Sequence, residues 1–267
     1  IAKEQLIKFD RSTACQEILG SVGQSNTAQN YYEFTRPEIQ ALIEPTSKKI
    51  LDIGCAAGKM AGEIKQKLGA EVWGIEPVSE AADQAKKHLD KVLNSSIEDA
   101  LNELPNQFFD TIIFADVLEH LEDPYSILKM ILGKLSPKGQ IIASIPNVRH
   151  WSVLKDLLEG RWDYQDAGIL DRTHLRFFTR KSIGDMFDQS GYEIMAKSAT
   201  TLGDQGAPPQ VVKALSQGGL DVSSLKEDSR HYQYLVKATP RVAASPVVDR
   251  KALVSIIMLT WNALKYT

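Results

Sequence analysis

The residues most able to do chemistry stand together at positions 116–120, with the sequence Asp-Val-Leu-Glu-His. If this stretch begins a helical turn, Asp116 lies three residues before Glu119 and four before His120, and these spacings bring side chains together. Two carboxylates and an imidazole so arranged suit a divalent cation such as Mg²⁺ or Mn²⁺. Neutral imidazoles also titrate near pH 7, so His120, His174 and His150 are candidate catalytic bases.

A second stretch, residues 49–59, joins a short apolar run to a series of small residues. The run predicts a buried parallel strand, and the small residues predict a tight turn before a helix at 60–68. Strand, glycine turn and helix form the nucleotide-binding unit of open α/β sheets. A dinucleotide site needs G-x-G-x-x-G/A, which the frame Gly54-x-Ala56-x-x-Lys59 does not satisfy.

The shorter frame Gly54-x-Ala56-x-Gly58 resembles the G-x-G-x-G loop of class I S-adenosylmethionine (SAM) methyltransferases, with alanine at the middle glycine. The resemblance implies SAM as the cofactor. Glu76 ends the next predicted strand, at a distance from the turn typical of an acid that holds a ribose. The positions that we match to the cofactor are Tyr31, Asp52, Gly54, Cys55, Ala56, Gly58, Glu76, Pro77, Ser96, Ile97 and Asp116.

Some of these positions have a structural alternative. Tyr31 lies in an aromatic segment that resembles the part of such enzymes that covers the methionine end of SAM, but its ring would serve equally well to pack a helix onto the sheet. Ser96 and Ile97 lie in the loop that the resemblance places along the adenine. The acids that follow them also suit the first turn of a helix.

Three further stretches, 117–120, 144–147 and 173–179, are similar to a subset of class I methyltransferases that act on sugars and other small hydroxylated acceptors. The layout also resembles metal-dependent enzymes that methylate the terminal 2′-hydroxyl of small RNAs. That resemblance implies a metal set of Asp116, Glu119, His120 and His174, with aspartate where those enzymes have glutamate. A sugar hydroxyl is a poor acid, so its methylation needs a base or a cation. For each histidine a hydrogen-bonded structural role is the alternative.

Composition limits the function classes. The 267 residues are 43% hydrophobic and 24% charged, as in ordinary globular proteins. The net charge of -3 gives no bulk attraction to nucleic acid or to an anionic membrane. The two cysteines, Cys15 and Cys55, favour a reducing cytosol over a disulfide framework, and no apolar run has transmembrane length. We predict a cytoplasmic protein, brought to the inner face of a membrane only if a longer parent chain carries it there.

The order of elements predicts the fold class. Apolar runs predict strands at 49–53, 71–76, 91–94, 109–115, 140–145, 192–198 and 232–238, and helical patterns lie at 38–43, 60–68, 79–89, 180–190 and 209–215. Residues 152–173 are predicted as a long connection. The expected fold is an α/β, Rossmann-like seven-stranded sheet with helices on both faces, preceded by an N-terminal helical extension. The methyltransferase resemblance implies that strand seven is antiparallel.

The chain divides into an N-terminal helical segment at 1–48, a methyltransferase domain at 49–239, a linker at 240–252 and a last strand at 253–267. That strand ends in Thr260-Trp261-Asn262 and resembles the opening strand of family 2 glycosyltransferases, so we predict the start of a truncated second domain. An eighth, edge strand of the first domain is the alternative.

This neighbourhood predicts methylation of a sugar hydroxyl during polysaccharide or glycolipid assembly, with a glycosyltransferase domain in the same chain as partner. Three other hypotheses stay open. One is a methyltransferase for a small non-sugar acceptor, such as a phenol or a carboxylate. The second is an NAD-dependent oxidoreductase, which Ala56 and Lys59 disfavour. The third is a non-catalytic SAM-binding scaffold.

Overall fold

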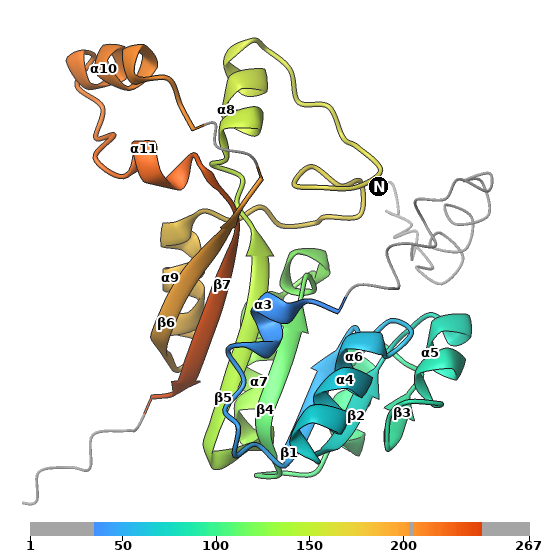
Figure 1. Cartoon of the computed structure of the whole chain (residues 1–267). Coiled ribbons are helices and arrows are strands. Elements are labelled where there is room, and N and C mark those ends of the chain that lie inside the picture. The colour runs from blue at the N-terminus through green and yellow to red at the C-terminus, as the bar shows by residue number, and fades with distance from the viewer. Residues whose placement is uncertain (1–34, 203–205, 242–267) are drawn as a thin grey trace, which may run out of the picture.

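The computed structural model describes residues 35–202 and 206–241. Its strands form one seven-stranded sheet in the order β3-β2-β1-β4-β5-β7-β6 (Figure 1). The first five strands are parallel to their neighbours, β7 is antiparallel to β5, and β6 is antiparallel to β7. This confirms the predicted Rossmann-like sheet with an antiparallel seventh strand. The strands are β1 (Lys49–Ile53), β2 (Glu71–Ile75), β3 (Lys91–Leu93), β4 (Phe109–Ala115), β5 (Leu135–Pro146), β6 (Tyr192–Thr201) and β7 (His231–Pro240).

Helices cover both faces of the sheet because the parallel strands expose apolar side chains on both sides. One core cluster joins the sheet to α6, α7 and α9, and the other joins it to α3, α4 and Ala85 of α5. Neighbouring residues of one strand alternate between the clusters, as Leu51 and Ile50 do. The helices are α3 (Pro37–Gln40), α4 (Lys59–Leu68), α5 (Ser79–Ala85), α6 (Ile97–Ala100), α7 (Pro124–Ile131), α8 (Trp151–Leu158), α9 (Arg180–Gln189), α10 (Pro209–Gln217) and α11 (Leu225–Asp228), with short 3₁₀ turns η1 (Leu101–Glu103), η2 (Leu118–His120) and η3 (Leu132–Lys134).

The strand order reverses between β1 and β4, which are paired in the middle of the sheet. Open α/β sheets bind their ligands outside the carboxyl ends of the strands at such a reversal. The turn after β1 and η2 after β4 therefore face the same end of the sheet, and the long connection between β5 and β6 also lies at this end (Figure 1).

Three predicted elements differ from the structure. Helix α5 ends at Ala85 instead of Leu89, because the next turn tightens: the N–H of His88 donates to the carbonyl of Ala85. Strand β5 begins at Leu135, and the predicted turn at 136–139 is an irregularity within it, where the pairing with β4 shifts register. The predicted connection contains helix α8, whose only buried residue is Val153, so its apolar pattern lacks a buried stripe.

The predictions for both ends of the chain fall largely outside the described residues. Of the N-terminal helical segment, the structure describes α3, which begins at Pro37. Tyr31, most of the linker at 240–252 and the glycosyltransferase-like strand at 253–267 lie outside the described residues. None of the helices in residues 35–202 and 206–241 combines the length and the apolarity that a membrane crossing requires.

Candidate functional site

The turn after β1 is built from left-handed backbone. Gly54, Ala56 and Gly58 have φ angles of 70°, 49° and 76°, a conformation that favours glycine and costs alanine some energy. A side chain at Gly58 would place its Cβ 2.9 Å from the Cα of Ala85 in α5. Glycine at this position thus lets the start of α4 pack closely against α5.

Glu76, which follows β2, is hydrogen-bonded to the backbone of this turn. Its two carboxylate oxygens accept hydrogen bonds from the backbone N–H groups of Ala56 and Val78, each at 2.9 Å. Burial raises the pKa of Glu76, and the two N–H donors oppose that rise. The structure therefore places this predicted ribose ligand directly against the glycine turn, although it does not line the main cavity.

Asp52 is a buried acid at the end of β1, beside the glycine turn. It is 2% exposed, and its Oδ1 has no hydrogen-bond partner. Burial, together with the charge of Glu76, raises the pKa of Asp52 to about 7, while Arg36 opposes the rise. A buried acid without a partner is costly, so this oxygen is a natural place for a cationic or hydrogen-donating ligand.

The main cavity opens at the carboxyl ends of β1, β4 and β5, and it has a volume of about 600 Å³. It brings together most of the polar residues that the sequence singled out. Its lining residues are Thr35, Arg36, Pro37, Glu38, Asp52, Gly54, Cys55, Ala56, Lys59, Met60, Ala115, Asp116, Glu119, His120, Pro146, Ala167, Gly168, Asp171, His174, Tyr232 and Gln233.

Asp116 lines this cavity, and both of its carboxylate oxygens accept hydrogen bonds from other residues. Its backbone is left-handed, with φ 57°. Its Oδ1 accepts from Ser144 and from Gln233, both at 2.8 Å, and its Oδ2 accepts from the guanidinium of Arg36. The interaction of Arg36 with Asp116 crosses 80 positions of sequence, so no local pattern could indicate Arg36 as a cavity residue.

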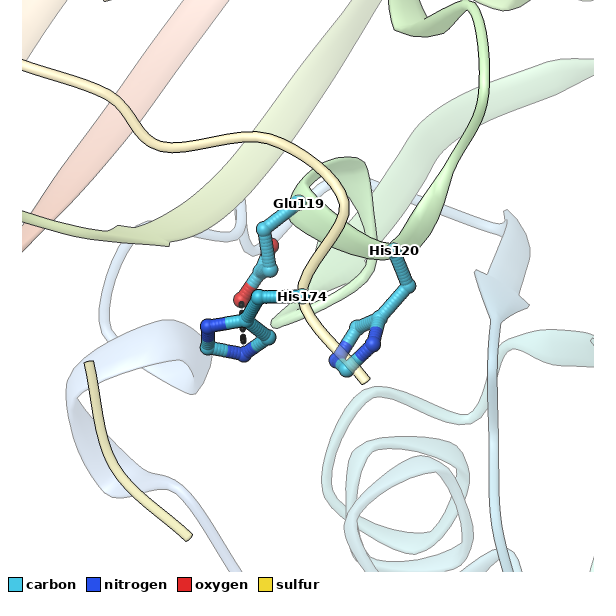
Figure 2. A group of neighbouring side chains, drawn as sticks. All are labelled: Glu119, His120 and His174. Atoms are coloured by element: carbon cyan, nitrogen blue, oxygen red, sulfur yellow. Dashed lines mark ion pairs between the residues drawn. The ribbon is translucent and has the colours of Figure 1, made fainter. Parts of the chain in front are cut away.

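Glu119, His120 and His174 form the second polar feature of the cavity, named here the Glu119–His120–His174 group (Figure 2). Nitrogen and oxygen atoms of the three side chains lie within 4.8 Å of one another. The Nε2 of His174 is 3.9 Å from the Oε1 of Glu119, and the two imidazole centroids are 4.7 Å apart. The backbone carbonyl of Glu119 accepts from the N–H groups of Leu175 and Arg176, which fixes the His174 loop against η2.

Backbone carbonyls orient both imidazoles. The Nδ1 of His174 lies 2.9 Å from the carbonyl oxygen of Ile169, and the Nδ1 of His120 lies 3.2 Å from that of Thr173. A carbonyl only accepts, so each Nδ1 carries the proton and each Nε2 keeps its lone pair. Such a bond to Nδ1 is typical of histidines that act as bases or metal ligands.

Glu119 is 1% exposed, and neither of its carboxylate oxygens has a hydrogen-bond partner. Burial, with the charge of Asp116, raises its pKa well above the usual value. Burial and the neighbouring ring of His174 lower the pKa of His120. Burial therefore disfavours the charged forms of Glu119 and His120, and one ligand atom of each of the three side chains lies close to those of the other two.

The predicted metal set is thus brought together in part. Glu119, His120 and His174 meet, while the carboxylate of Asp116 is satisfied by three donors and is not part of their group. A fourth protein ligand is therefore missing from the arrangement that the sequence predicts. Asp116, which stands where the resembling enzymes have glutamate, anchors Arg36 instead.

Other predicted positions lie apart from the cavity. His150 caps α8, where its Nδ1 bonds the hydroxyl and the N–H of Ser152, and it does not line the cavity. Ser96 caps α6 by accepting from the N–H of Asp99 at 3.2 Å, and Ile97 is buried in the core. Pro77 is exposed after β2. The cofactor roles of Ser96, Ile97 and Pro77 and the catalytic role of His150 stay predictions.

Aromatic rings gather beside the Glu119–His120–His174 group. Phe177 is 6.4 Å from the ring of His174 and also contacts Trp162 and Tyr164, at 5.4 and 6.3 Å between centroids. Trp162 is 37% exposed and Tyr164 is 43% exposed. The connection between β5 and β6 therefore presents an aromatic surface next to the cavity, which its composition alone could not position.

Comparisons with known proteins agree with this geometry. A family model described as a methyltransferase domain matches residues 27–197. The chain is 38% identical over 106 residues to the mitochondrial ubiquinone biosynthesis O-methyltransferase of Schizosaccharomyces pombe, covering 37% of this chain and 38% of that protein. It is 34% identical over 109 residues to the enzyme of the same name from Actinobacillus pleuropneumoniae, covering 38% of this chain and 46% of that protein. The chain spans less than half of the length of both relatives.

Solved structures show the same fold at low identity. A SAM-dependent methyltransferase from Archaeoglobus fulgidus matches with a TM-score of 0.56 and 16% identity, over 79% of this chain and 97% of the other. A SAM-bound magnesium protoporphyrin IX methyltransferase from Synechocystis matches with a TM-score of 0.54 and 14% identity, over 89% of this chain and 100% of the other. The predicted cofactor, SAM, is thereby confirmed at the level of family and fold.

The prediction of a sugar acceptor is wrong. The similar relatives are named for the biosynthesis of ubiquinone, not for glycan assembly. Of the three stretches on which the prediction depended, 117–120 and 173–179 bring Glu119, His120 and His174 together and hold the His174 loop against η2. Neither task distinguishes a sugar from another hydroxylated acceptor, and the glycosyltransferase-like strand lies outside the described residues.

Proposed function

Because the chain belongs to the methyltransferase domain family, we propose that it is a SAM-dependent O-methyltransferase whose acceptor is a phenolic hydroxyl of a small aromatic molecule. The names of its relatives support an aromatic acceptor. The aromatic side chains beside His174 support it as well, because flat rings pack well against edges and faces of other rings. This is the non-sugar alternative that the sequence left open.

The observation that carries the proposal is that Asp52, Arg36 and the Glu119–His120–His174 group line one cavity. When bound, SAM supplies a methyl group already activated on a positively charged sulfur. Its amino-acid end is a zwitterion, and the unpaired oxygen of Asp52 suits the ammonium while Arg36 suits the carboxylate. The left-handed turn at 54–58 lets the backbone approach the cofactor closely.

The chain's own chemical task is to align the acceptor and to take its proton. The Nε2 atoms of His120 and His174 keep lone pairs, since each Nδ1 bonds a carbonyl. A phenol has a pKa near ~10, much closer to that of an imidazole than an aliphatic hydroxyl has. A positioned base of this kind contributes roughly 10²–10⁴ in rate. His174 is the stronger candidate, because it is also next to Phe177.

We also infer that the same three side chains can hold a divalent cation. The two free oxygens of the buried Glu119 and two Nε2 atoms provide the donors, and the carbonyls at Nδ1 provide the outer contacts that orient such ligands. A set with two imidazoles suits Mn²⁺ better than Mg²⁺. Bound there, a cation would lower the pKa of the acceptor hydroxyl.

The test is to measure S-adenosylhomocysteine formation by the purified chain with SAM and a simple catechol, and in parallel with an aliphatic diol. We expect turnover of the catechol alone. Glu119→Gln should lower this turnover by roughly a hundredfold and should remove Mn²⁺ binding in calorimetry. His88→Gln is the matched control, because His88 is exposed and lies outside the cavity. SAM binding without turnover of any phenol would overturn the acceptor assignment.

A further inference from the structure

A second cavity, of about 690 Å³, lies on the side of the sheet that α9 covers. We name it the basic cavity. Its walls come from the segment after β5, from the first turns of α9, from β6 and from the region of α11. It shares no lining residue with the main cavity, so its chemistry is separate from that of methyl transfer.

Positive charge dominates this cavity. Its lining includes the cations Arg149, Arg180, Lys181 and Lys197, against two acids, Asp221 and Asp228. Helix α9 adds the positive end of its dipole, since it has ten residues and no acid in its first turn. Within the described residues, neither Lys181 nor Lys197 has an acidic side chain within ion-pair distance.

The acid at the centre of this cavity positions the two arginines. Asp228 is 2% exposed, and its Oδ2 accepts from the Nη1 of Arg149 at 2.8 Å. Its Oδ1 accepts from the hydroxyl of Tyr234 at 3.1 Å, and the Nη1 of Arg180 is 3.7 Å away. Asp228 therefore holds the guanidinium of Arg149 by a hydrogen bond and forms a looser ion pair with Arg180, whose Nη1 also lies 3.9 Å from Glu227.

Lys197 contributes a positive charge to the basic cavity that no described acidic side chain pairs with. It is half-buried on β6, and its Nζ donates to the backbone carbonyl of Arg180 at 3.3 Å. Burial, with the nearby charge of Arg180, lowers the pKa of Lys197. The protein therefore keeps a partly desolvated ammonium in a cavity whose net charge is positive.

We propose that the basic cavity binds the phosphoryl group of a small phosphorylated molecule. Guanidinium groups form forked hydrogen bonds with phosphate oxygens, and lysine ammoniums add point charges. An anion there would supply the acidic partner that Lys181 and Lys197 lack among the described residues, and it would meet the N-terminus of α9. The four cations come from three separate elements and line one cavity, two of them, Arg180 and Lys181, on its exposed side.

The end of β5 connects the two cavities. Pro146 lines the main cavity and Arg149 lines the basic cavity. Between them, Asn147 is fully buried, and its amide donates to the carbonyls of Asp228 and His231, both at 2.8 Å. The backbone N–H of Arg149 donates to the Oδ1 of Asn147 at 3.0 Å. An occupied basic cavity would therefore stabilise the strand end that also forms the wall of the methyl-transfer site.

The experiment is calorimetric titration of the chain with inorganic phosphate, pyrophosphate and phenyl phosphate at low salt. We expect saturable binding of at least one of them. Lys197→Met and Lys181→Gln should each weaken it by about tenfold or more, as expected for the loss of one charged contact. Lys67→Met is the control, since Lys67 is exposed in α4 and outside both cavities.

The titrations also separate the possible sources of the phosphate. Tight binding of inorganic phosphate alone would assign a site for the free ion, whereas tighter binding of phenyl phosphate would assign a site for an ester. SAM affinity of the Lys197→Met variant should equal that of the wild type, so this proposal and the proposed function can fail separately. Circular dichroism checks that each variant is folded. Absence of binding in the wild type, or equal weakening by Lys67→Met, would overturn the proposal.

Discussion

The two halves of the sheet shape the main cavity in different ways, one through backbone geometry and the other through side chains. In the half formed by β3, β2, β1 and β4, local backbone geometry shapes the site: a left-handed turn, strand ends and one buried acid. In the half formed by β5, β7 and β6, the long connection between β5 and β6 bonds the backbone of η2 and brings His174 beside Glu119. In our proposal, the turn after β1 presents backbone to the cofactor, and the connection between β5 and β6 places side chains beside η2, around the acceptor.

This difference predicts which substitutions would disrupt each half. A turn built from backbone fails when a side chain is added, because the neighbouring element stands too close. A cluster built from side chains fails when one member is removed, because each group orients the next. Substitutions in the turn after β1 should therefore change folding and cofactor binding, and substitutions in the Glu119–His120–His174 group should change turnover.

The largest expected effect is on the acceptor side. His174→Ala should lower turnover roughly 10²–10⁴-fold, because it removes the Nε2 closest to Glu119. The affinity for SAM, measured by calorimetry, should stay within about threefold of the wild type. A parallel loss of SAM affinity would break the division between the two halves, and His174→Gln separates the loss of the base from the loss of packing.

The next effect is on the stability of the cofactor half. Gly58→Ala should lower the free energy of unfolding by about 2–4 kcal/mol, since it adds both a left-handed penalty and a contact with α5. Gly69→Ala is the matched control. Gly69 has φ 56° with nothing within 4 Å of its Cβ, so its cost should be about 1 kcal/mol. Urea denaturation measures both, and equal losses would show that the close approach to α5 is unimportant.

A third effect concerns Asp52 in the absence of ligand. Its pKa is raised to about 7 from an unfolded value near ~3.9, so the native state holds a proton that the unfolded state releases. The contribution of Asp52 to stability is therefore fully present below pH ~4 and is lost as the pH rises through 7. Asp52→Asn should remove this dependence, which thermal denaturation between pH 4 and 7 measures for the wild type and the variant.

Binding of SAM should show the opposite pH dependence at the same residue. A cationic ligand prefers ionised Asp52, so the affinity should rise about tenfold between pH 6 and 8 as the carboxyl loses its proton. The ammonium of SAM titrates near the upper end of this range, so the comparison is made with Asp52→Asn, which shares that titration. The same slope in the variant would show that Asp52 does not contact the cofactor.

The smallest effect should come from the aromatic surface. Trp162→Leu should raise the KM for a phenolic acceptor about threefold and leave kcat unchanged, because one ring contact contributes roughly 0.5–1.5 kcal/mol. Met195→Ala, an exposed substitution on β6, is the control. A change in kcat instead of KM would mean that Trp162 positions His174 through Phe177.

The cofactor half could be predicted well because its signals are local. The apolar run at β1, the small residues at 54–58 and the acid at the end of β2 lie close in sequence. The capping box of α9, in which Thr179 and Ser182 bond each other's backbone, is equally local. Such features depend on neighbours within a few residues, which a single sequence contains.

The acceptor half was predicted less completely because its contacts are distant in sequence. The meeting of Glu119 with His174 was found by resemblance and confirmed by geometry, whereas Arg36 and Gln233 reach Asp116 from far along the chain. His150 was expected to be a base, but the structure uses its ring to cap α8, a role usually filled by serine, threonine or aspartate. No periodicity indicates such pairings.

The contacts of Arg36 have a consequence for the rate of cofactor exchange. Arg36 ties one wall of the main cavity to Asp116 and, at 3.0 Å, to the hydroxyl of Ser144. A wall held by charged contacts opens more readily when salt screens them. If departure of S-adenosylhomocysteine limits the reaction, turnover should increase at moderate ionic strength. The ion pair that stabilises this wall would then lower the rate of the whole catalytic cycle.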